Sequence, residues 1–201
     1  AIIGASGYGG LQLVKLISDH PDFEIAYLSG ERSSGKSWNN LNPFIKIPID
    51  IEIATSDIDA IVEVAEYAIL SLPNGLASQI TPLLLKKGIK VIDLSADYRF
   101  KSLDKWKEIY STEAIKYERF DYELCEEAIY GFPEEFRSQI SRSRLIACPG
   151  CYPTSSLSVL IPFSKQGLIE SEGIIIDAKS GTSGGGRNPS EQLLLSECSE
   201  S

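Results

Sequence analysis

Short apolar runs alternate with helical patterns along most of this chain. After the first run, Leu11, Val14 and neighbouring apolar residues recur at helical spacing until Pro21. Residues 74–88 are also predicted to form a helix, which ends in two lysines and a capping glycine. The predicted strands are residues 1–4, 24–30, 49–54, 67–73, the start of 90–100, and 144–148. Strands that alternate with helices predict an α/β fold, a Rossmann-type doubly wound parallel sheet with helices on both faces.

The remaining segments suggest where a second domain begins. Residues 31–48 are interpreted as a loop, and 101–128 as surface helix and loop. Beyond Cys148 we expect a helix at 154–166, bent by Pro162, and a strand at 173–180. The predicted domains are therefore 1–148 and 149–201, the latter the start of an incomplete α+β domain. The chain opens inside a strand without a methionine, so we expect both ends to be truncated.

Composition narrows the function only slightly. The formal net charge of −9 argues against nucleic-acid binding, because phosphates favour basic surfaces. No apolar run approaches the roughly 18 residues that a membrane span needs. Four cysteines in 201 residues do not form a disulfide scaffold, so we expect a reducing, cytoplasmic location.

A glycine turn joins the first strand to the first helix. Gly4, Gly7 and Gly10 have the spacing G-x-x-G-x-x-G. Without side chains, the backbone can turn tightly and bring its N–H groups against a pyrophosphate at the helix N-terminus. The alternative is a tight strand-to-helix turn that binds nothing.

The end of the second strand indicates which dinucleotide is bound. An NAD-specific site usually places an acid there for the ribose hydroxyls. Here Glu31 is acidic, but it is surrounded by groups suited to a 2′-phosphate, namely Ser29, Arg32, Ser33, Ser34 and Lys36. The sequence therefore favours NADP, the alternative being a solvated charged loop.

The stretch "ACPGCYPTSS" contains two cysteines, Cys148 and Cys151, and allows three interpretations. A redox pair normally opens the first helix of a thioredoxin-like unit, whereas this pair comes late. A zinc site needs further ligands, and His20 is the only histidine. We expect His20 instead to cap the first helix by a charge–dipole interaction. No metal is therefore predicted.

The third interpretation presents one thiol to a substrate. A Pro-Gly turn and then Pro153 predict that Cys151 opens a helix. The helix dipole and unpaired N–H groups favour a thiolate there and can stabilise an oxyanion. The alternative for Cys151 is a small buried hydrophobic residue, and that interpretation is preferred for Cys148.

Several motifs together resemble one known family. In order, they are "GASGYGG", "SLPNGLASQ", "VIDLSADYRF", "YGFPE", "ACPGCYPTS" and "DAKSGTSGGGR". They closely resemble the N-acetyl-γ-glutamyl-phosphate reductases, NADP-dependent enzymes of arginine biosynthesis in the semialdehyde dehydrogenase group. The chain is more distantly similar to aspartate-semialdehyde dehydrogenase.

The resemblance implies roles for particular residues. Cys151 would be the nucleophile, and Arg99 would meet an anionic group of the substrate. The second domain would be a catalytic and dimerisation domain, so the full-length protein is expected to be a homo-oligomer. The family's catalytic histidine would lie beyond Ser201. The residues expected near the cofactor are Gly4, Ser6, Gly7, Tyr8, Gly10, Pro73, Asn74, Ser183, Gly184 and Gly185.

The expected reaction is the NADPH-dependent reduction of a small acyl phosphate, N-acetyl-γ-glutamyl phosphate, to the semialdehyde through a cysteine thioester. Two alternatives remain open. One is another thiol-dependent semialdehyde dehydrogenase of the aspartate type. The other is an NADP-binding fragment without catalysis.

Overall fold

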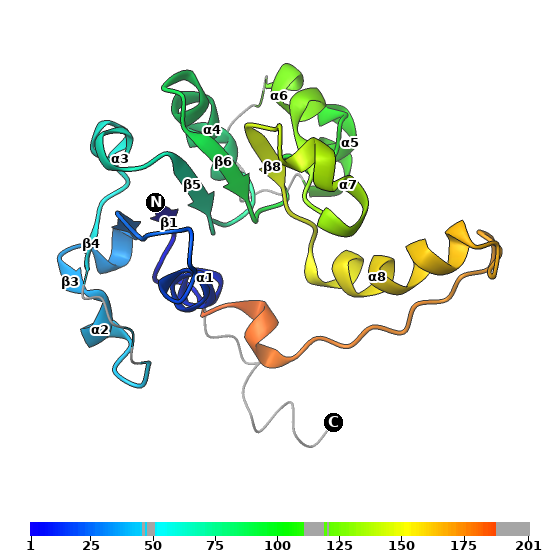
Figure 1. The fold of residues 1–201 in the computed structure, drawn as a ribbon, viewed down its shortest axis with the longest axis horizontal. Helices are drawn as coiled ribbons and strands as arrows, with labels where there is room; N and C mark the ends of the chain where they lie inside the picture. The colour runs from blue at the N-terminus through cyan, green and yellow to red at the C-terminus, as the bar shows by residue number, and fades with distance from the viewer. Residues whose placement is uncertain (46, 48–50, 111–118, 120, 188–201) are drawn as a thin grey trace.

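The computed structural model describes residues 1–45, 47, 51–110, 119 and 121–187. Within them, eight strands form one sheet in the order β3-β4-β2-β1-β5-β6-β8-β7 (Figure 1). All neighbouring strands are parallel except β3 and β4. The strands are β1 (Ile2–Ile3), β2 (Leu28–Ser29), β3 (Lys36–Ser37), β4 (Glu52–Ala54), β5 (Tyr67–Leu70), β6 (Lys90–Asp93), β7 (Ile129–Tyr130) and β8 (Leu145–Ala147).

The strand order confirms the predicted doubly wound sheet. From β1 the chain winds outward through β2 to β4, and then returns to the other side of β1 for β5, β6 and β8. The winding direction therefore reverses between β1 and β5. In such sheets, ligands bind in the crevice at the carboxyl ends of the strands at this reversal.

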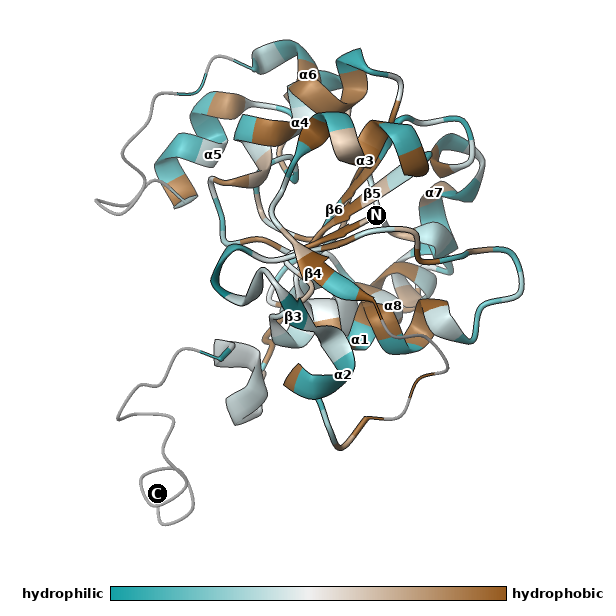
Figure 2. Cartoon of the chain, turned by 90° about the vertical axis from the view of Figure 1, so that its left-hand side faces the viewer, coloured by the Kyte–Doolittle hydropathy of each residue, from teal (hydrophilic) through white to brown (hydrophobic). Residues whose placement is uncertain are grey.

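Helices cover both faces of the sheet (Figure 2). Because neighbouring side chains of a strand point to opposite faces, Ile2 belongs to one core cluster, with Leu11, Val14 and Trp38, and Ile3 to the other, with Ile61, Leu84 and Trp106. The helices are α1 (Tyr8–Ser18), α2 (Trp38–Leu41), α3 (Ile58–Val64), α4 (Ala77–Lys86), α5 (Leu103–Tyr110), α6 (Tyr122–Glu127), α7 (Pro133–Ile140) and α8 (Cys151–Lys165); the 3-10 turns are η1 (Glu31–Ser33) and η2 (Thr182–Gly185).

The segment after β8 leaves the body of the sheet. α8 projects outward, and an extended segment leads from it back toward α1 (Figure 1). No described residue from Cys151 onward is buried. The strand expected at 173–180 is wrong: this segment has no sheet partner among the described residues, and Ile175 is 92% exposed. Its apolar residues have β propensity, but a strand also requires a neighbouring strand to pair with.

Other expectations are corrected in detail. Residues 31–48 are not simply a loop, because they contain η1, β3 and α2, and Trp38 is fully buried. The helix expected at 154–166 begins earlier, at Cys151. In the strand expected at 49–54, pairing covers Glu52–Ala54, while residues 49 and 50 lie outside the described part.

His20 contributes to the end of α1 through its main chain. Its main-chain N–H donates to the oxygen of Ile17 at 3.0 Å. Its ring Nδ1 accepts a hydrogen bond from the main-chain N–H of Asp22 at 3.1 Å. The expected charge–dipole interaction of its ring with the helix stays a prediction.

Candidate active site

Four parallel strands carry the candidate residues to one edge of the sheet. The glycine turn follows β1, Pro73 and Asn74 follow β5, and residues 94–99 follow β6. Cys148 and Cys151 follow β8, two strands beyond β5 in the sheet. Gly4 and Cys151, which are 147 residues apart in sequence, thus both lie along the carboxyl edge, where an α/β sheet binds its ligands.

The glycine turn has no room for a side chain at two of its positions, Gly4 and Gly10. Gly4 has φ +88°, and a β-carbon there would lie 2.2 Å from the carbonyl oxygen of Ser71. A β-carbon on Gly10 would lie 2.3 Å from the oxygen of Gly4. These two glycines are required by the fold itself, whether or not a ligand binds.

Gly7 is different, because its surroundings are open. It is the N-cap of α1, no side chain caps the helix, and a β-carbon there would meet only the oxygen of Gly4 at 3.6 Å. The first N–H groups of the helix therefore face a space where an anion fits. Tyr8, the first residue of the helix, is 43% exposed, and Ser6 lies against Gly30 at the end of β2. A cofactor pyrophosphate fits this open cradle.

The residues expected around a 2′-phosphate, at the end of β2, differ in how accessible their side chains are. Ser29 is fully buried, and its hydroxyl pairs with that of Ser56 at 3.1 Å. Ser33 is also buried, whereas Arg32 is exposed. Glu31, the residue that argued for NAD, accepts a hydrogen bond from the main-chain N–H of Ser56 at 3.0 Å. Arg32 is therefore the better placed of these side chains to meet a bound anion.

Cys151 is the first residue of α8, as the Pro-Gly turn predicted. Gly150 is the N-cap, and no side chain caps this helix of 15 residues. The thiol is exposed, so the alternative of a buried hydrophobic residue does not apply to it. The arrangement combines a reachable sulfur with unpaired N–H groups and the positive end of a helix dipole.

The other described cysteines lie in settings that oppose ionisation. Burial, reinforced by the charge of Asp93, raises the pKa of Cys148 to about 11, although Arg99 opposes this. Burial likewise raises the pKa of Cys125 to about 11. Both thiols therefore stay protonated near neutral pH. Cys198 lies outside the described residues.

Arg99 lies beside the turn that precedes Cys151. Its Nε donates to the oxygen of Cys148 at 2.8 Å, and its Nη2 to the oxygen of Leu94 at 2.9 Å. Its Nη1 lies 3.2 Å from where a β-carbon of Gly150 would stand. Two of its three nitrogens thus bind the protein's own main chain, and Nη1 is the one directed toward the start of α8.

Two further segments approach this edge. Pro73 and Asn74 are exposed, and the Oδ1 of Asn74 accepts from the N–H of Ala96 at 3.0 Å. Ser183, Gly184 and Gly185 form the turn η2. Two residues later, Arg187 lies over the ring of Tyr8, 5.2 Å from its centre, which brings the end of this glycine-rich segment to the start of α1.

Sequence reasoning missed two buried carboxylates next to these residues. Asp93 and Asp97 are both fully buried at the carboxyl end of β6. Burial raises the pKa of Asp93 to about 7, against hydrogen bonds from Ser95 that lower it. The signal was an acidic pair, Asp-Leu-Ser-Ala-Asp, at the end of a predicted buried strand.

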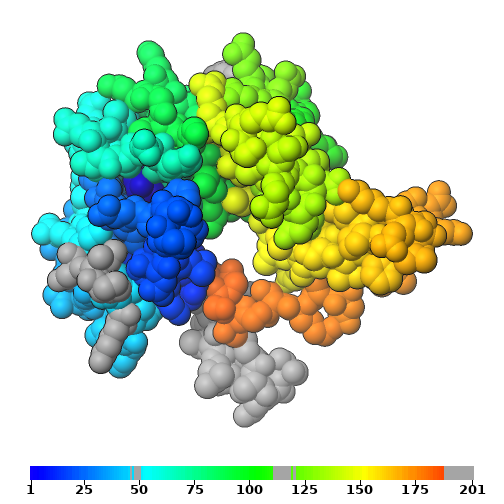
Figure 3. All heavy atoms as spheres, in the orientation of Figure 1, coloured from blue at the N-terminus to red at the C-terminus, as the bar shows by residue number. Residues whose placement is uncertain are grey.

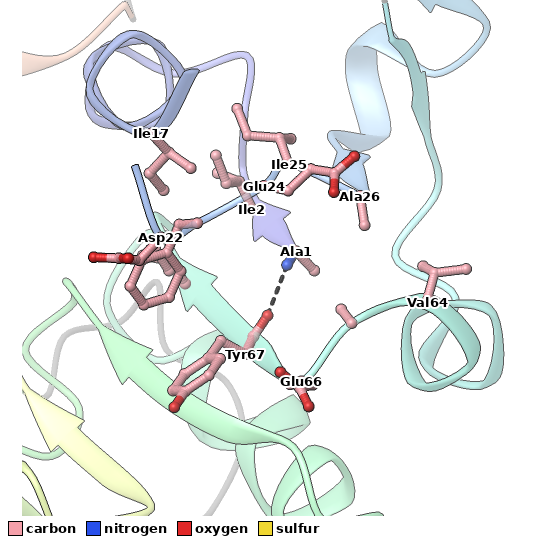
Figure 4. Close-up of a pocket in the computed structure, with 13 residues that line it drawn as sticks. Ala1, Ile2, Ile17, Asp22, Glu24, Ile25, Ala26, Val64, Glu66 and Tyr67 are labelled. Carbon is pink, nitrogen blue, oxygen red and sulfur yellow. Dashed lines mark hydrogen bonds between the residues drawn. The ribbon is translucent and has the colours of Figure 1, made fainter. Parts of the chain in front are cut away.

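Of two pockets in the structure, one lies beside the candidate site and the other at the opposite edge of the sheet. A pocket of about 560 Å³ lies between α1 and α8, lined by Leu13, Cys148 and Thr154 among others, and Figure 3 shows the molecule hollowed there. A second pocket lies at the amino ends of β1 and β5, where the amino group of Ala1 donates to the oxygen of Tyr67 at 2.6 Å (Figure 4). That pocket is at the wrong edge of the sheet for the candidate site.

The described residues contain neither a membrane-spanning helix nor a cluster of metal ligands. None of their helices combines the length and the hydrophobicity that crossing a bilayer requires. Nowhere in the same ranges do three His, Cys, Asp or Glu side chains gather as metal ligands.

Two family models match successive parts of the chain. Residues 1–143 match the semialdehyde dehydrogenase NAD binding domain, and residues 151–201 match the semialdehyde dehydrogenase dimerisation domain. Residues 144–150, which hold β8, Cys148 and the turn before Cys151, lie between the two matches.

Curated relatives are similar over the whole chain. It is 80% identical over 201 residues to the N-acetyl-gamma-glutamyl-phosphate reductase of Prochlorococcus marinus strain NATL2A. It is 53% identical over 201 residues to the enzyme of the same name in Parasynechococcus marenigrum strain WH8102. In both cases the match covers 100% of this chain and 56% of the relative, so the chain spans about half the relatives' length.

Solved structures share the fold. An aspartate semialdehyde dehydrogenase II from Vibrio cholerae, complexed with ASA, matches with a TM-score of 0.57 and 20% identity over 82% of this chain and 45% of its own. An aspartate semialdehyde dehydrogenase with NADP from Candida albicans matches with a TM-score of 0.59 and 17% identity, over 84% and 47%. With the family matches over almost the entire sequence, the chain belongs to the semialdehyde dehydrogenase family.

Proposed function

We propose that the full-length protein containing this chain reduces N-acetyl-γ-glutamyl phosphate to N-acetyl-glutamate 5-semialdehyde, with NADPH, in arginine biosynthesis. The observation that carries the proposal is Cys151, an exposed thiol at the uncapped N-terminus of α8, on the sheet edge that also bears the glycine turn. The named relatives, at up to 80% identity in the examples above, support the choice of substrate.

Cys151 has the first chemical role. Its thiolate attacks the acyl carbon, and the N–H groups at the start of α8 stabilise the oxyanion that forms. The carbon–oxygen bond to phosphate breaks, phosphate leaves with the bonding electron pair, and a thioester remains on the sulfur. This covalent step divides one difficult reaction into two easier ones.

The cofactor site is assigned to the glycine turn and its neighbours. Gly4, Ser6, Gly7, Tyr8 and Gly10 would hold the pyrophosphate at the start of α1. Arg32 would meet the 2′-phosphate directly, and Ser29 and Ser33, which are buried, would lie behind it. Pro73 and Asn74 would line the nicotinamide side, and Ser183, Gly184 and Gly185 would form a glycine-rich loop near the cofactor. When bound, the nicotinamide supplies the hydride that reduces the thioester carbonyl. The sulfur of Cys151 then leaves as thiolate, and the aldehyde is released.

Arg99 retains one nitrogen for the substrate. Because Nε and Nη2 already bind main-chain oxygens, we assign only Nη1 to an anionic group of the substrate. A guanidinium fixed in this way offers its charge without the entropy cost of ordering a free side chain.

The remaining parts of the proposal concern organisation. We propose that residues 1–148 form the NADP-binding domain and 149–201 the start of the catalytic and dimerisation domain, which makes the full-length protein a homo-oligomer. Its acid–base histidine would come from the part beyond this chain, as in the family that the motifs resemble. The three described cysteines are unpaired, in keeping with a cytoplasmic enzyme.

The experiment is a substrate comparison in the reverse direction. The full-length protein is given phosphate and NADP with either N-acetyl-glutamate 5-semialdehyde or aspartate semialdehyde, and NADPH formation is followed. We expect phosphate-dependent turnover that strongly favours the N-acetyl compound. Preference for aspartate semialdehyde would assign the other substrate, and NADP binding without any turnover would indicate a protein that does not catalyse.

A further inference from the structure

The loop at residues 94–99 holds the first turn of α4. Asp97, fully buried in this loop, accepts two main-chain hydrogen bonds: Oδ1 from the N–H of Gly75 at 2.6 Å, and Oδ2 from the N–H of Ser78 at 2.9 Å. Gly75 has φ +90°, a conformation that suits glycine. One carboxylate thus fixes the backbone directly after Asn74.

The same loop also fixes the side chain of Asn74. Its Oδ1 accepts from the N–H of Ala96 at 3.0 Å. Since the oxygen is used as the acceptor, the orientation of the amide is set, and its NH₂ group is the part left to donate. Asn74 is exposed, so this NH₂ group is available to a ligand on the carboxyl edge of the sheet.

On its other side, the loop holds the turn before Cys151. Arg99 donates to the oxygen of Cys148 at 2.8 Å, and its guanidinium lies against Gly150. Just before the loop, the main-chain oxygen of Asp93 accepts from the N–H of Cys148 at 2.8 Å. Hydrogen bonds at successive positions thus connect the end of β6 to the start of α8.

A buried arginine supports the loop from behind. Arg119, 3% exposed, donates through Nη1 to the main-chain oxygen of Asp97 at 2.9 Å. Its guanidinium lies 4.3 Å from the ring centre of Trp106 and pairs with Asp121 through Nε at 3.0 Å and Nη2 at 2.8 Å. Paired and stacked in this way, Arg119 limits the freedom of the loop to shift.

We propose that the 94–99 loop is a brace that sets the nicotinamide-side residues and the Cys151 turn at a fixed spacing, with Asp97 and Arg99 as positioning residues. The inference rests on the proposed function, because the spacing matters only if hydride is delivered to a carbonyl on Cys151. Asp97 acts on the α4 side and Arg99 on the α8 side. A small error in such spacing slows a reaction strongly without abolishing substrate binding.

If Asp97 only capped a helix, its loss would affect stability but not the reaction. A second aspartate that only caps a helix provides the control for this difference. Asp57 caps α3 with the same chemistry, since its Oδ1 accepts from the N–H groups of Asp59 at 3.0 Å and Ala60 at 3.2 Å, and it takes no part in the brace. In the full-length protein, Asp97→Ala and Asp57→Ala each remove an aspartate cap. We expect both variants to lose stability through the lost cap.

The kinetic constants of the two variants should differ, although both lose a cap. We expect Asp97→Ala to lower kcat about 10²-fold at saturating substrate and NADPH, and Asp57→Ala to leave it unchanged. KM for the acyl phosphate should change little. The rate of Cys151 alkylation should also be unchanged, because Asp97 acts on the α4 side. With NADPH deuterated at the transferred position, Asp97→Ala should show a larger isotope effect than the wild type, as hydride transfer becomes slower.

Asp97→Asn provides the graded test. An amide can accept only one of the two hydrogen bonds, so its kcat should lie between those of wild type and Asp97→Ala. If Asp97→Ala does not fold, Asp97→Asn replaces it in the comparison with Asp57→Ala. Equal kcat in the Asp97 and Asp57 variants, or an unchanged isotope effect, would overturn the brace while leaving the proposed function intact. An inactive wild type would instead overturn the proposed function, and with it this role for Asp97.

Discussion

The Nε of Arg99 lies 2.8 Å from the main-chain oxygen of Cys148, three residues before the thiol of Cys151. The same guanidinium reaches the oxygen of Leu94 at 2.9 Å through Nη2. A rigid fork of donors can bind two carbonyl oxygens at once, whereas an ammonium group provides a point charge at the end of a flexible stem. Arg99 and Lys are therefore not equivalent at this position.

Arg99→Lys should loosen the turn before Cys151. We expect a loss of stability of about 1.5–3 kcal/mol, the typical worth of one hydrogen bond to a charged group, and a changed rate of Cys151 alkylation. Urea unfolding and timed alkylation with peptide mapping measure the two effects. Arg142→Lys is the control, because that exposed arginine precedes β8, at the opposite end of the strand from the turn, and donates through Nε to the oxygen of Ser138 at 3.0 Å. Identical behaviour of both variants would contradict the role given to Arg99.

Gly4 and Gly7 should respond differently to alanine. Gly4→Ala forces a β-carbon against the oxygen of Ser71 at a positive φ, so we expect a loss of stability of about 1–3 kcal/mol. Gly7→Ala has room in the fold, so it should stay stable but bind NADPH more weakly, since the methyl group enters the cradle at the start of α1. Thermal unfolding and a fluorescence titration with NADPH test the pair. Equal effects on both properties would refute this division of roles.

Arg32 should set the preference for NADPH over NADH. It is an exposed cation shortly after the end of β2, and a 2′-phosphate adds about two negative charges there. Arg32→Ala should weaken NADPH binding and leave NADH binding nearly unchanged, as measured by titration with each dinucleotide. An unchanged ratio of the two affinities would show that a residue other than Arg32 binds the 2′-phosphate.

Asp93 should make stability depend on pH in an unusual direction. Its pKa is raised from 3.8 to about 7 by burial. Between these values the folded state keeps a proton that the unfolded state releases, so stability falls as pH rises from about 4 to about 7. Asp93→Asn removes this dependence and can still bond with Ser95. Urea midpoints compared at about pH 5 and about pH 8 should therefore favour the variant more at the higher pH. Parallel curves would contradict the assignment.

The sheet was predictable because most of its strands are buried. Runs such as residues 67–73 and 144–148 are nearly continuous in apolar residues, which is typical of parallel strands covered on both faces. The segment 173–180 also contains an apolar run, the three isoleucines at 174–176, but such a run does not reveal whether a partner strand is present. β3, made of Lys36 and Ser37, was missed because two polar residues give no hydrophobic pattern, although they pair with β4.

The candidate site residues that belong to short sequence motifs could be predicted. Turn residues around Cys151 and the spacing of the glycines are visible within ten residues of sequence. Asp97 was not, because its partners Gly75 and Ser78 lie 22 and 19 residues away and are reached through their main-chain N–H groups, which any residue but proline provides. Only the folded arrangement of β5, β6 and α4 brings them together.

The central claim is that Cys151 carries the acyl group, and the direct measurement is mass spectrometry of the full-length protein after reaction with N-acetyl-glutamate 5-semialdehyde and NADP in the absence of phosphate. Without phosphate the thioester cannot be released to acyl phosphate, so it should accumulate with a burst of about one NADPH per protomer. Peptide mapping should place the N-acetylglutamyl adduct on Cys151, and Cys151→Ser should show neither adduct nor burst. An adduct on Cys148 or Cys125, or a normal burst in the Cys151→Ser variant, would contradict the account.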